Sequence, residues 1–285
     1  MSTPDSVKYS NTPSPNENVW GVGLKDAKRQ GRGTAYADVA QSVTGVILGL
    51  FLFCHMAFTS SIQFGKDLFA NLINTSGGAF LTGGHEMLWL HVAFVGFIFL
   101  CVVIHAFCAL RRFPTSYAKF RDIRAHTDML KHEDTTLWMV QLVTAFLLFI
   151  FVFPHLVGML VNPSSFDPHL IGVHTYHTGM IWTFIFLVVT ELHGMIGLYR
   201  LAVKWDIFAA DPTTGIMGQR DKTDRTGLRK TMLIVALLMI VCGTLTAWKN
   251  YSIGAEQVAL QEEAVMAGEV YNPRYQLADE NNWWK

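Results

Sequence analysis

The sequence has little charge and few of the patterns that are typical of a soluble enzyme. Only 15% of its 285 residues are charged, 51% are hydrophobic, and the formal net charge is zero. The four cysteines include no CxxC pair, which argues against a disulfide framework or a zinc site. No low-complexity segment and no internal repeat stand out. These absences favour a single membrane domain over a soluble or a disulfide-rich secreted protein.

Five apolar stretches are long enough to cross a bilayer. They cover residues 38–62, 87–110, 137–162, 178–201 and 231–249. Each is close to the roughly 20 residues that about 30 Å of hydrocarbon requires. The first 35 residues are polar and contain no signal-peptide h-region, so we expect the first span to act as its own insertion signal. The predicted fold is an all-α membrane protein with five transmembrane helices.

The distribution of lysine and arginine predicts how these helices are oriented. Basic residues concentrate before the first span and in the second and fourth connections, whereas the other two connections contain only Lys66 and the tail is acidic. The positive-inside rule then predicts a cytoplasmic N-terminus and a periplasmic C-terminus. We expect a cytoplasmic arm at 1–35, a transmembrane domain at 36–250 and a periplasmic tail at 251–285. Helical spacing in the connection at 118–138 indicates a further helix.

Four of the eleven histidines lie well inside predicted spans, each in a different one. They are His55, His105, His155 and His193. Each helical residue advances the chain by about 1.5 Å. His55 and His155 lie past the midpoints of spans that run outward, so they are nearer the outer side. His105 and His193 lie past the midpoints of spans that run inward, so they are nearer the cytoplasmic side. The histidines therefore form two pairs at two depths, roughly 15 Å apart along the membrane normal. Two stacked bis-histidine haems in a four-helix core require such an arrangement.

Two other interpretations of these histidines stay open. Single histidines often form hydrogen bonds between membrane helices, although this does not account for pairing by depth. A transition-metal transporter would also place histidines in its spans, but it would more often add carboxylates along one path. Glu191 is the only carboxylate deep in the apolar core. A transport or sensing protein of this kind would be colourless when purified.

Glu191 stands two residues before His193 in the fourth span. Two residues correspond to a rotation of about 200°, so Glu191 faces nearly away from His193 and does not support the same haem. A carboxyl group in a low dielectric tends to be neutral at pH 7, which suits a proton relay. The alternative is a protonated side chain that only bonds a neighbouring helix.

Several segments of the sequence resemble one known family. They are QSVTGVILGLFLFCH, IHAFCALRRFP, HEDTTLWMVQ and ELHGMIGLYRLAVKW, within residues 38–230. They are similar to the dihaem cytochrome b subunits of menaquinol:fumarate reductases, in the wider succinate:quinone oxidoreductase family. The resemblance implies two haem b groups, with His55 and His155 binding the distal iron and His105 and His193 binding the proximal iron.

The resemblance also implies roles for polar residues near the helix ends. Gln41, Ser42, Trp138 and Lys204 match family positions near the haem propionates, and they lie at a depth suited to hydrogen bonds with those groups. Glu191 matches a family glutamate that is implicated in moving protons across the membrane together with the electrons.

The quinol site departs from the family pattern. A glutamate is expected in the outer connection before the second span, but an ungapped count back from His105 reaches Gly78. The nearest carboxylate is Glu86, with His85 and His91 beside it, and these three residues form the predicted quinol site. The alternative role for Glu86 is that of a cap at the start of a helix.

The predicted function is that of a membrane anchor in an enzyme complex. It would oxidise menaquinol at the bacterial cytoplasmic (inner) membrane and pass electrons through two haems to an iron–sulfur subunit and a flavoprotein subunit with FAD. These partners would lie on the cytoplasmic face and reduce fumarate to succinate. The resemblance allows a dimer of such heterotrimers, and no nucleic acid is expected as a partner. A succinate:quinone reductase and a cytochrome b anchor of a hydrogenase or formate dehydrogenase stay open as alternatives.

Overall fold

The computed structural model describes residues 32–83, 86–130, 132–205 and 222–277, and these residues contain helices and no strand. The chain divides into two units, Met1–Val39 and Ala40–Lys285. Every contact described below lies within the second unit.

Five helices are long and apolar enough to cross a membrane. They are α1 (Gly33–Ser60), α4 (Leu88–Leu110), α6 (Glu133–Val161), α8 (Met180–Lys204) and α9 (Lys222–Ala267). Each overlaps one of the apolar stretches recognised in the sequence over most of its length, so the predicted all-α fold with five membrane spans is confirmed. The longest, α9, continues without a break well past the apolar stretch at 231–249.

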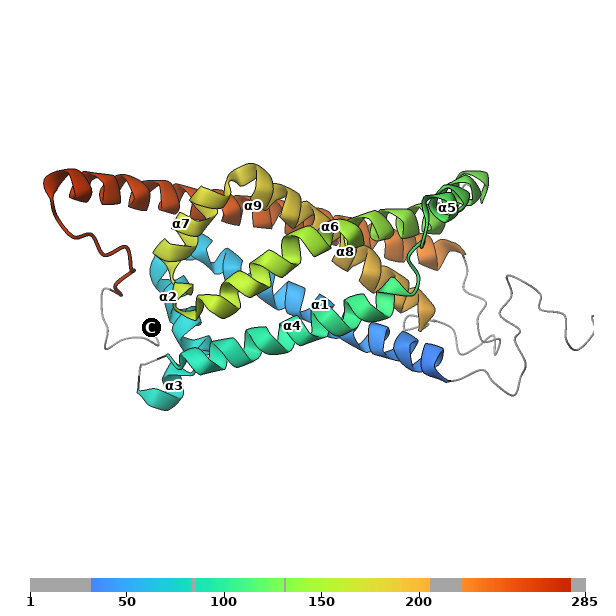
Figure 1. Ribbon diagram of the computed structural model, residues 1–285, viewed down its shortest axis with the longest axis horizontal. Helices are drawn as coiled ribbons and strands as arrows, with labels where there is room; N and C mark the ends of the chain where they lie inside the picture. The colour runs from blue at the N-terminus through green and yellow to red at the C-terminus, as the bar shows by residue number, and fades with distance from the viewer. Residues whose placement is uncertain (1–31, 84–85, 131, 206–221, 278–285) are drawn as a thin grey trace, which may run out of the picture. The chain divides into compact units, whose positions relative to one another are not determined.

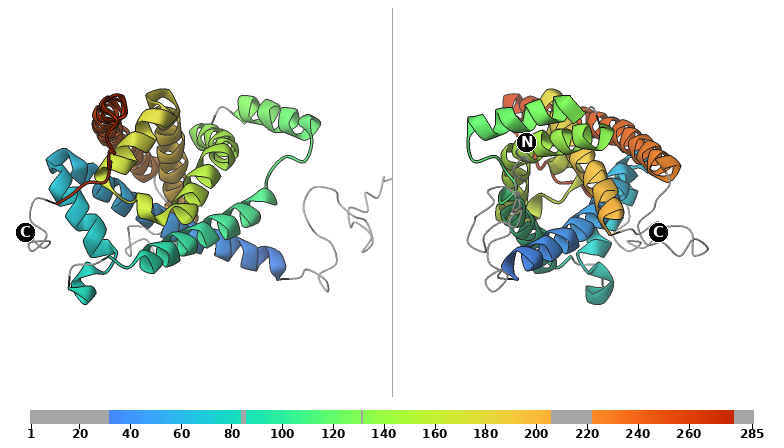
Figure 2. Two further views of the ribbon diagram at one scale, coloured as in Figure 1. Left: turned by 60° about the vertical axis from the view of Figure 1, so that its left-hand side comes forward. Right: turned by 90° about the vertical axis from the view of Figure 1, so that its right-hand side faces the viewer.

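Shorter helical segments connect the long helices. They are η1 (Ser61–Phe64), α2 (Lys66–Ser76), α3 (Ala79–Thr82), α5 (Tyr117–Leu130), η2 (Pro163–Ser165) and α7 (Pro168–Thr178). The helix expected within 118–138 is present as α5, whereas α2 and α7 were not predicted. Figures 1 and 2 show α2, α3 and α7 at one end of the helices and α5 at the other. We call the first the α2–α7 end.

The long helices alternate in direction. Helices α1, α6 and α9 run toward the α2–α7 end, and α4 and α8 run back (Figure 1). The opposite end collects Arg111, Arg200, Lys204 and Arg229 from the ends of α4, α8 and α9. We call it the basic end.

The start of α7 follows from two adjacent residues. The side chain of Asp167 accepts hydrogen bonds from the backbone N–H groups of His169 (2.9 Å) and Leu170 (3.0 Å), and Pro168 occupies the first helical position. Helix α7 then packs along α9, where the backbones of Gly172 and Gly254 touch because neither residue has a side chain. This packing covers the side of α9 near the α2–α7 end.

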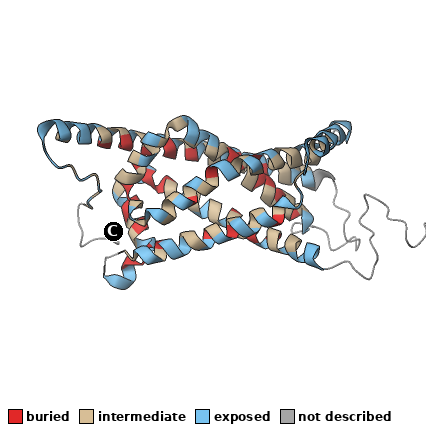
Figure 3. Cartoon of the chain, in the orientation of Figure 1, coloured by how far each residue is buried: buried red, intermediate tan, exposed pale blue. Residues whose placement is uncertain are grey.

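The buried core has two parts, one between α8 and α9 and one where η1 and α2 meet α9. The first contains Met195, Ile196, Tyr199, Met232 and Ala236, and the second contains Ile62, Phe69, Ile73 and Ile253. Figure 3 shows that buried residues follow the facing sides of the helices. Large apolar side chains such as Phe107 (77% exposed) and Ile181 (79%) point outward. Such an outer surface is suited to lipid rather than to water.

Candidate functional site

His55 on α1 and His155 on α6 face each other. Their ring centroids are 6.3 Å apart and their ring planes are inclined by 73°. Two metal–imidazole bonds of about 2 Å each, with the distance from nitrogen to ring centre added, place opposed imidazole centroids about 6 Å apart. The spacing of this pair therefore fits an iron held between the two rings. Phe51 stacks on His55 at 5.2 Å, and Phe186 lies 5.4 Å from His155, so the surroundings are aromatic and apolar.

His105 on α4 and His193 on α8 lie nearer the basic end. Nδ1 of His105 is 3.2 Å from Oγ1 of Thr44 on α1, and Nδ1 of His193 is 3.3 Å from Oγ1 of Thr144 on α6. Thr44 stands about three helical turns before His55 along α1. The threonine contacts therefore place His105 and His193 at a different level of the bundle from the facing pair His55 and His155.

The residues that make these contacts recur at the same spacing on α1 and α6. They are Gln41, Thr44 and His55 on α1, and Gln141, Thr144 and His155 on α6. The two glutamine side chains are also bound alike, because Oε1 of Gln41 accepts from Arg111 (3.4 Å) and Oε1 of Gln141 accepts from Arg200 (2.5 Å). The expectation of no internal repeat is therefore wrong. Four apolar residues between these positions recur as well, because Val43, Leu48, Phe51 and Phe53 are matched by Val143, Leu148, Phe151 and Phe153.

Three of the four residues expected near propionates come together at the basic end. Nζ of Lys204 donates a hydrogen bond to Oγ of Ser42 at 2.9 Å, which joins the end of α8 to the first part of α1. Gln41 precedes Ser42, and Trp138 lies half-buried in the second turn of α6. Amide, hydroxyl and ammonium donors are suited to binding carboxylates, so this donor set fits the propionates of a haem.

Glu191 is fully buried, with an exposed fraction of 0%. It lies one turn before Met195, which packs against Met232 and Ala236, so it belongs to the face of α8 that meets α9. Among the described residues, neither of its carboxyl oxygens has a hydrogen-bond partner. An unpaired carboxylate anion in such a place carries a large desolvation cost, so Glu191 is a group that needs a proton or a polar partner.

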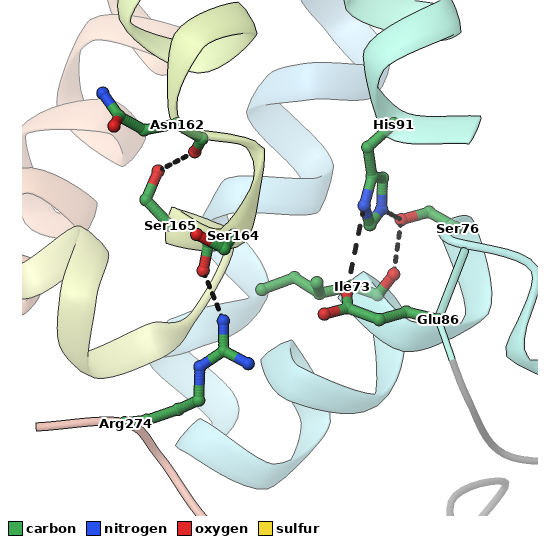
Figure 4. A network of polar contacts seen from close by, with 8 residues as sticks. All are labelled: Ile73, Ser76, Glu86, His91, Asn162, Ser164, Ser165 and Arg274. Atoms are coloured by element: carbon green, nitrogen blue, oxygen red, sulfur yellow. Dashed lines mark hydrogen bonds and ion pairs between the residues drawn. The ribbon is translucent and has the colours of Figure 1, made fainter. Parts of the chain in front are cut away.

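Glu86 and His91 lie where α2 meets α4, beside Ser76 (Figure 4). Oγ of Ser76 donates to the backbone oxygen of Ile73 at 2.7 Å, so its lone pairs are free to accept from Nε2 of His91 at 3.3 Å. In neutral His91 the proton is then on Nε2, and Nδ1 is an acceptor. Oε2 of Glu86 lies 3.9 Å from this Nδ1, which is too far for a hydrogen bond. Within the described part of the chain, both atoms are buried without a hydrogen-bond partner.

The glycines beside this pair leave little room for side chains at their own positions. Gly78 has φ of +82°, and a side chain there would collide with Met87. A Cβ atom on Gly77 would lie 3.0 Å from Cβ of Glu86 and 2.8 Å from Cε1 of His91. Glu86 therefore takes up the space that a side chain on Gly77 would fill.

The sequence also offered a helix-cap role for Glu86 and a quinol-site role for His85. The N-cap residue of α4 is Met87, so the alternative role of Glu86 as a helix cap is not supported. His85 lies outside the described residues. Phe166, which precedes α7, lies against His91 with ring centroids 4.9 Å apart and ring planes inclined by 31°, which gives the site an aromatic wall.

A polar network that the sequence did not predict ties residues 268–277, the C-terminal strap, to α2 and α7. The backbone N–H of Tyr275 donates to Oδ2 of Asp167 at 3.0 Å, and its hydroxyl donates to Asp67. His169 bonds the backbone oxygen of Pro273 through Nδ1 and Lys66 through Nε2, both at 3.2 Å. Figure 4 shows a further contact of the strap, in which Arg274 donates a hydrogen bond to the backbone oxygen of Ser164 in η2.

The pKa values of two ionisable groups in this network are shifted. Burial, and then the hydrogen bond to Asp67, raise the pKa of Tyr275 to about 12. Burial, and then the charge of Lys66, lower the pKa of His169. No local sequence signal indicates these contacts, because the partners lie more than 100 positions apart.

Five helices that are long and apolar enough to span a membrane, with histidines in their interior, define a helical membrane protein, and comparison with known proteins gives its family. Residues 117–246 match the family model described as the succinate dehydrogenase/fumarate reductase transmembrane subunit. The chain is 34% identical over 238 residues to the fumarate reductase cytochrome b subunit of Wolinella succinogenes, covering 82% of this chain and 89% of the relative. It is 34% identical over 239 residues to the fumarate reductase cytochrome b subunit of Helicobacter pylori, covering 82% and 88%. The chain therefore belongs to the family of fumarate reductase cytochrome b membrane subunits.

Proposed function

We propose that this chain is the dihaem cytochrome b anchor of a menaquinol:fumarate reductase in the bacterial cytoplasmic membrane. The observation that carries the proposal is the facing pair His55 and His155, whose 6.3 Å spacing suits an iron between the rings. The relatives with which this chain shares most of its length are fumarate reductase cytochrome b subunits, which favours this role over a hydrogenase or formate dehydrogenase anchor.

The contacts of the histidines support haem ligation. When bound, haem b accepts and gives up one electron at a time, which is the chemistry that links a quinol to iron–sulfur clusters. His55 and His155 are the proposed distal ligands, and His105 and His193 are the proposed proximal ligands. Gln41, Ser42, Trp138 and Lys204 are the proposed propionate contacts at the basic end.

The basic end is the proposed cytoplasmic end, because loops rich in lysine and arginine stay on that side of the membrane. An iron–sulfur subunit and a flavoprotein subunit with FAD would bind there, and the flavoprotein would reduce fumarate to succinate. The arm at 1–35 would be cytoplasmic, the domain at 36–250 would lie in the membrane, and the tail at 251–285 would be periplasmic. Two such heterotrimers would form the dimer that the family resemblance allows.

Glu86 and His91, at the α2–α7 end, are the proposed menaquinol site. Within the described residues, Oε2 of Glu86 and Nδ1 of His91 are two acceptor atoms that no hydrogen-bond donor approaches. A quinol hydroxyl is a donor, and its proton would pass to one of these atoms as the quinol loses its electrons. His85 belongs to the same proposal on the sequence alone.

Glu191 is the proposed proton carrier inside the bundle. Its two buried oxygens lack a hydrogen-bond partner within the described residues, so a proton that binds there displaces no existing contact. A proton moved through this residue would offset the charge that electron transfer carries across the bilayer.

The proposal is tested by a pyridine haemochrome assay on the purified protein, with protein quantified in parallel. Two b-type haems per chain are expected. His55→Ala or His155→Ala, and separately His105→Ala or His193→Ala, should each remove one haem, whereas His126→Ala on the exposed face of α5 should remove none. A colourless protein would overturn the proposal and favour a transporter or sensor, and co-purifying hydrogenase or formate dehydrogenase subunits would favour that alternative.

A further inference from the structure

Thr44 and Thr144 contact histidine rings in the same way in two places. The hydroxyl of Thr44 donates to the backbone oxygen of Ala40 at 2.7 Å, and that of Thr144 donates to the backbone oxygen of Val140 at 2.9 Å. A hydroxyl group has one proton and two lone pairs. Each threonine therefore uses its proton within its own helix and turns a lone pair toward a histidine on the neighbouring helix.

This geometry fixes the tautomer of both histidines. Nδ1 of His193 lies 3.3 Å from Oγ1 of Thr144 and 3.3 Å from the backbone oxygen of Gln141, and both of these atoms are available only as acceptors. Nδ1 of His105 lies 3.2 Å from Oγ1 of Thr44, and the backbone of Gln41 interacts with the same histidine. Nδ1 must then carry the proton in each ring, which leaves Nε2 with a free lone pair to bind a metal.

The other histidine pair is held differently. Within the described residues, the ring contacts of His55 and His155 are with Phe51, with Phe186 and with each other. Stacking of this kind keeps a ring in a plane, but it does not select which nitrogen carries the proton. The two haem sites therefore differ in how firmly the protein sets its ligands.

A further contact beside each threonine keeps it opposite its histidine. Oε1 of Gln41 accepts from Arg111 at the end of α4, and Oε1 of Gln141 accepts from Arg200 on α8. Gly45, beside Thr44, leaves room for the approach, because a Cβ atom there would lie 3.3 Å from Cε1 of His105.

We propose that Thr44 and Thr144 are positioning residues that set the tautomer and ring orientation of His105 and His193 as ligands of the basic-end haem. The inference rests on the proposed dihaem function. Donation from Nδ1–H to an acceptor makes an imidazole a stronger electron donor, which stabilises ferric iron and lowers the reduction potential. The basic-end haem therefore owes part of its potential and its ligand geometry to two hydroxyl groups that do not touch it.

The test uses the purified complex with variants at both threonines. Thr44→Val and Thr144→Val remove the hydroxyl group and keep the branched shape, whereas Thr44→Ser and Thr144→Ser keep the hydroxyl group. Thr244→Val on α9 is the matched control, because Thr244 also donates to the backbone four residues earlier, at 2.7 Å, and within the described residues it has no hydrogen bond with a histidine. Low-temperature EPR of the ferric haems and a redox titration are the readouts, and His155→Ala identifies the signals of the other haem.

In the valine variants we expect a shifted EPR signal and a more positive midpoint potential for one haem only, or loss of that haem alone. The serine variants and Thr244→Val should resemble the unchanged protein. If both haem signals and both midpoints stay unchanged in the valine variants, or if Thr244→Val gives the same shift, the positioning role is wrong. Absence of haem from the unchanged protein would instead overturn the proposed function itself.

Discussion

The hydroxyl group of Tyr275 donates a hydrogen bond to Oδ1 of Asp67 at 2.6 Å, across 208 positions of the sequence. This bond holds the C-terminal strap against α2. Tyr275→Phe should lower the free energy of local opening of the strap by about 1 kcal/mol, which raises the equilibrium constant for opening roughly fivefold. Amide hydrogen exchange over 268–277 measures the change. Tyr117→Phe, at an exposed position on α5, is the control and should leave exchange in the strap unchanged.

The strap should also depend on pH in two windows. The folded pKa of His169 is lowered, so the unfolded state binds more protons below about pH 6.5, and stability falls as the pH drops through that range. The folded pKa of Tyr275 is raised to about 12, so stability falls as the pH rises from about 10 toward 12. Protection of the strap from exchange or proteolysis should therefore be greatest between these windows.

Single variants separate the two limbs of this pH profile. His169→Gln should remove the acid limb and leave the alkaline one, and Tyr275→Phe should do the reverse. The charged groups that shift the pKa of His169 are Lys66, Asp167 and Glu256. An acid limb that persists in His169→Gln would assign the pH dependence to another group.

Gly254 allows a close contact between α7 and α9 at the α2–α7 end. A Cβ atom there would overlap the backbone oxygen of Gly172 on α7. Gly254→Ala should therefore separate α7 from α9 and destabilise the protein by about 1–3 kcal/mol. Gly227→Ala, in open space near the start of the same helix, should be neutral or stabilising by up to about 1 kcal/mol. Thermal unfolding in detergent compares the two, and equal effects would contradict the packing argument.

The long helices could be predicted because their signal is local and continuous. Twenty apolar residues identify a span without knowledge of any contact, and the rise per residue then sets the depth of each histidine. The facing rings of His55 and His155 agree with that estimate. The short helix α7 was missed because its 11 residues mix apolar and polar types, although Asp167 followed by Pro168 is a recognisable helix start.

Contacts between distant segments could not be predicted in the same way. The bond between Tyr275 and Asp67 depends on where α9 ends and α2 begins, and neither position is fixed by residues near the other. The threonine contacts of His105 and His193 depend on the rotation of α1 against α4 and of α6 against α8. Hydropathy sets where a helix lies in the membrane, but it leaves this rotation to packing.

Glu86→Gln should impair quinol oxidation without removing haem. The amide cannot accept the quinol proton as a carboxylate does, and a proton acceptor at a reacting group typically contributes about 10²–10⁴-fold to the rate. We expect menaquinol-driven fumarate reduction to fall at least tenfold while the haemochrome content stays constant. Glu262→Gln, at an exposed position on α9, is the control. Unchanged turnover in Glu86→Gln would show that Glu86 and His91 do not form the quinol site.

Glu191→Gln should separate electron transfer from the movement of protons. The amide is close in size to the carboxyl group, so the fully buried position is still filled, and haem content should not change. Because glutamine cannot carry a proton at this position, menaquinol-driven turnover should fall, by at least about tenfold if this proton transfer limits the rate. Reduction of the haems by dithionite should remain complete, since it needs no proton relay. Glu263→Gln, exposed on α9, should retain full turnover. Unchanged turnover in Glu191→Gln would leave Glu191 as a buried group that contributes only to helix packing.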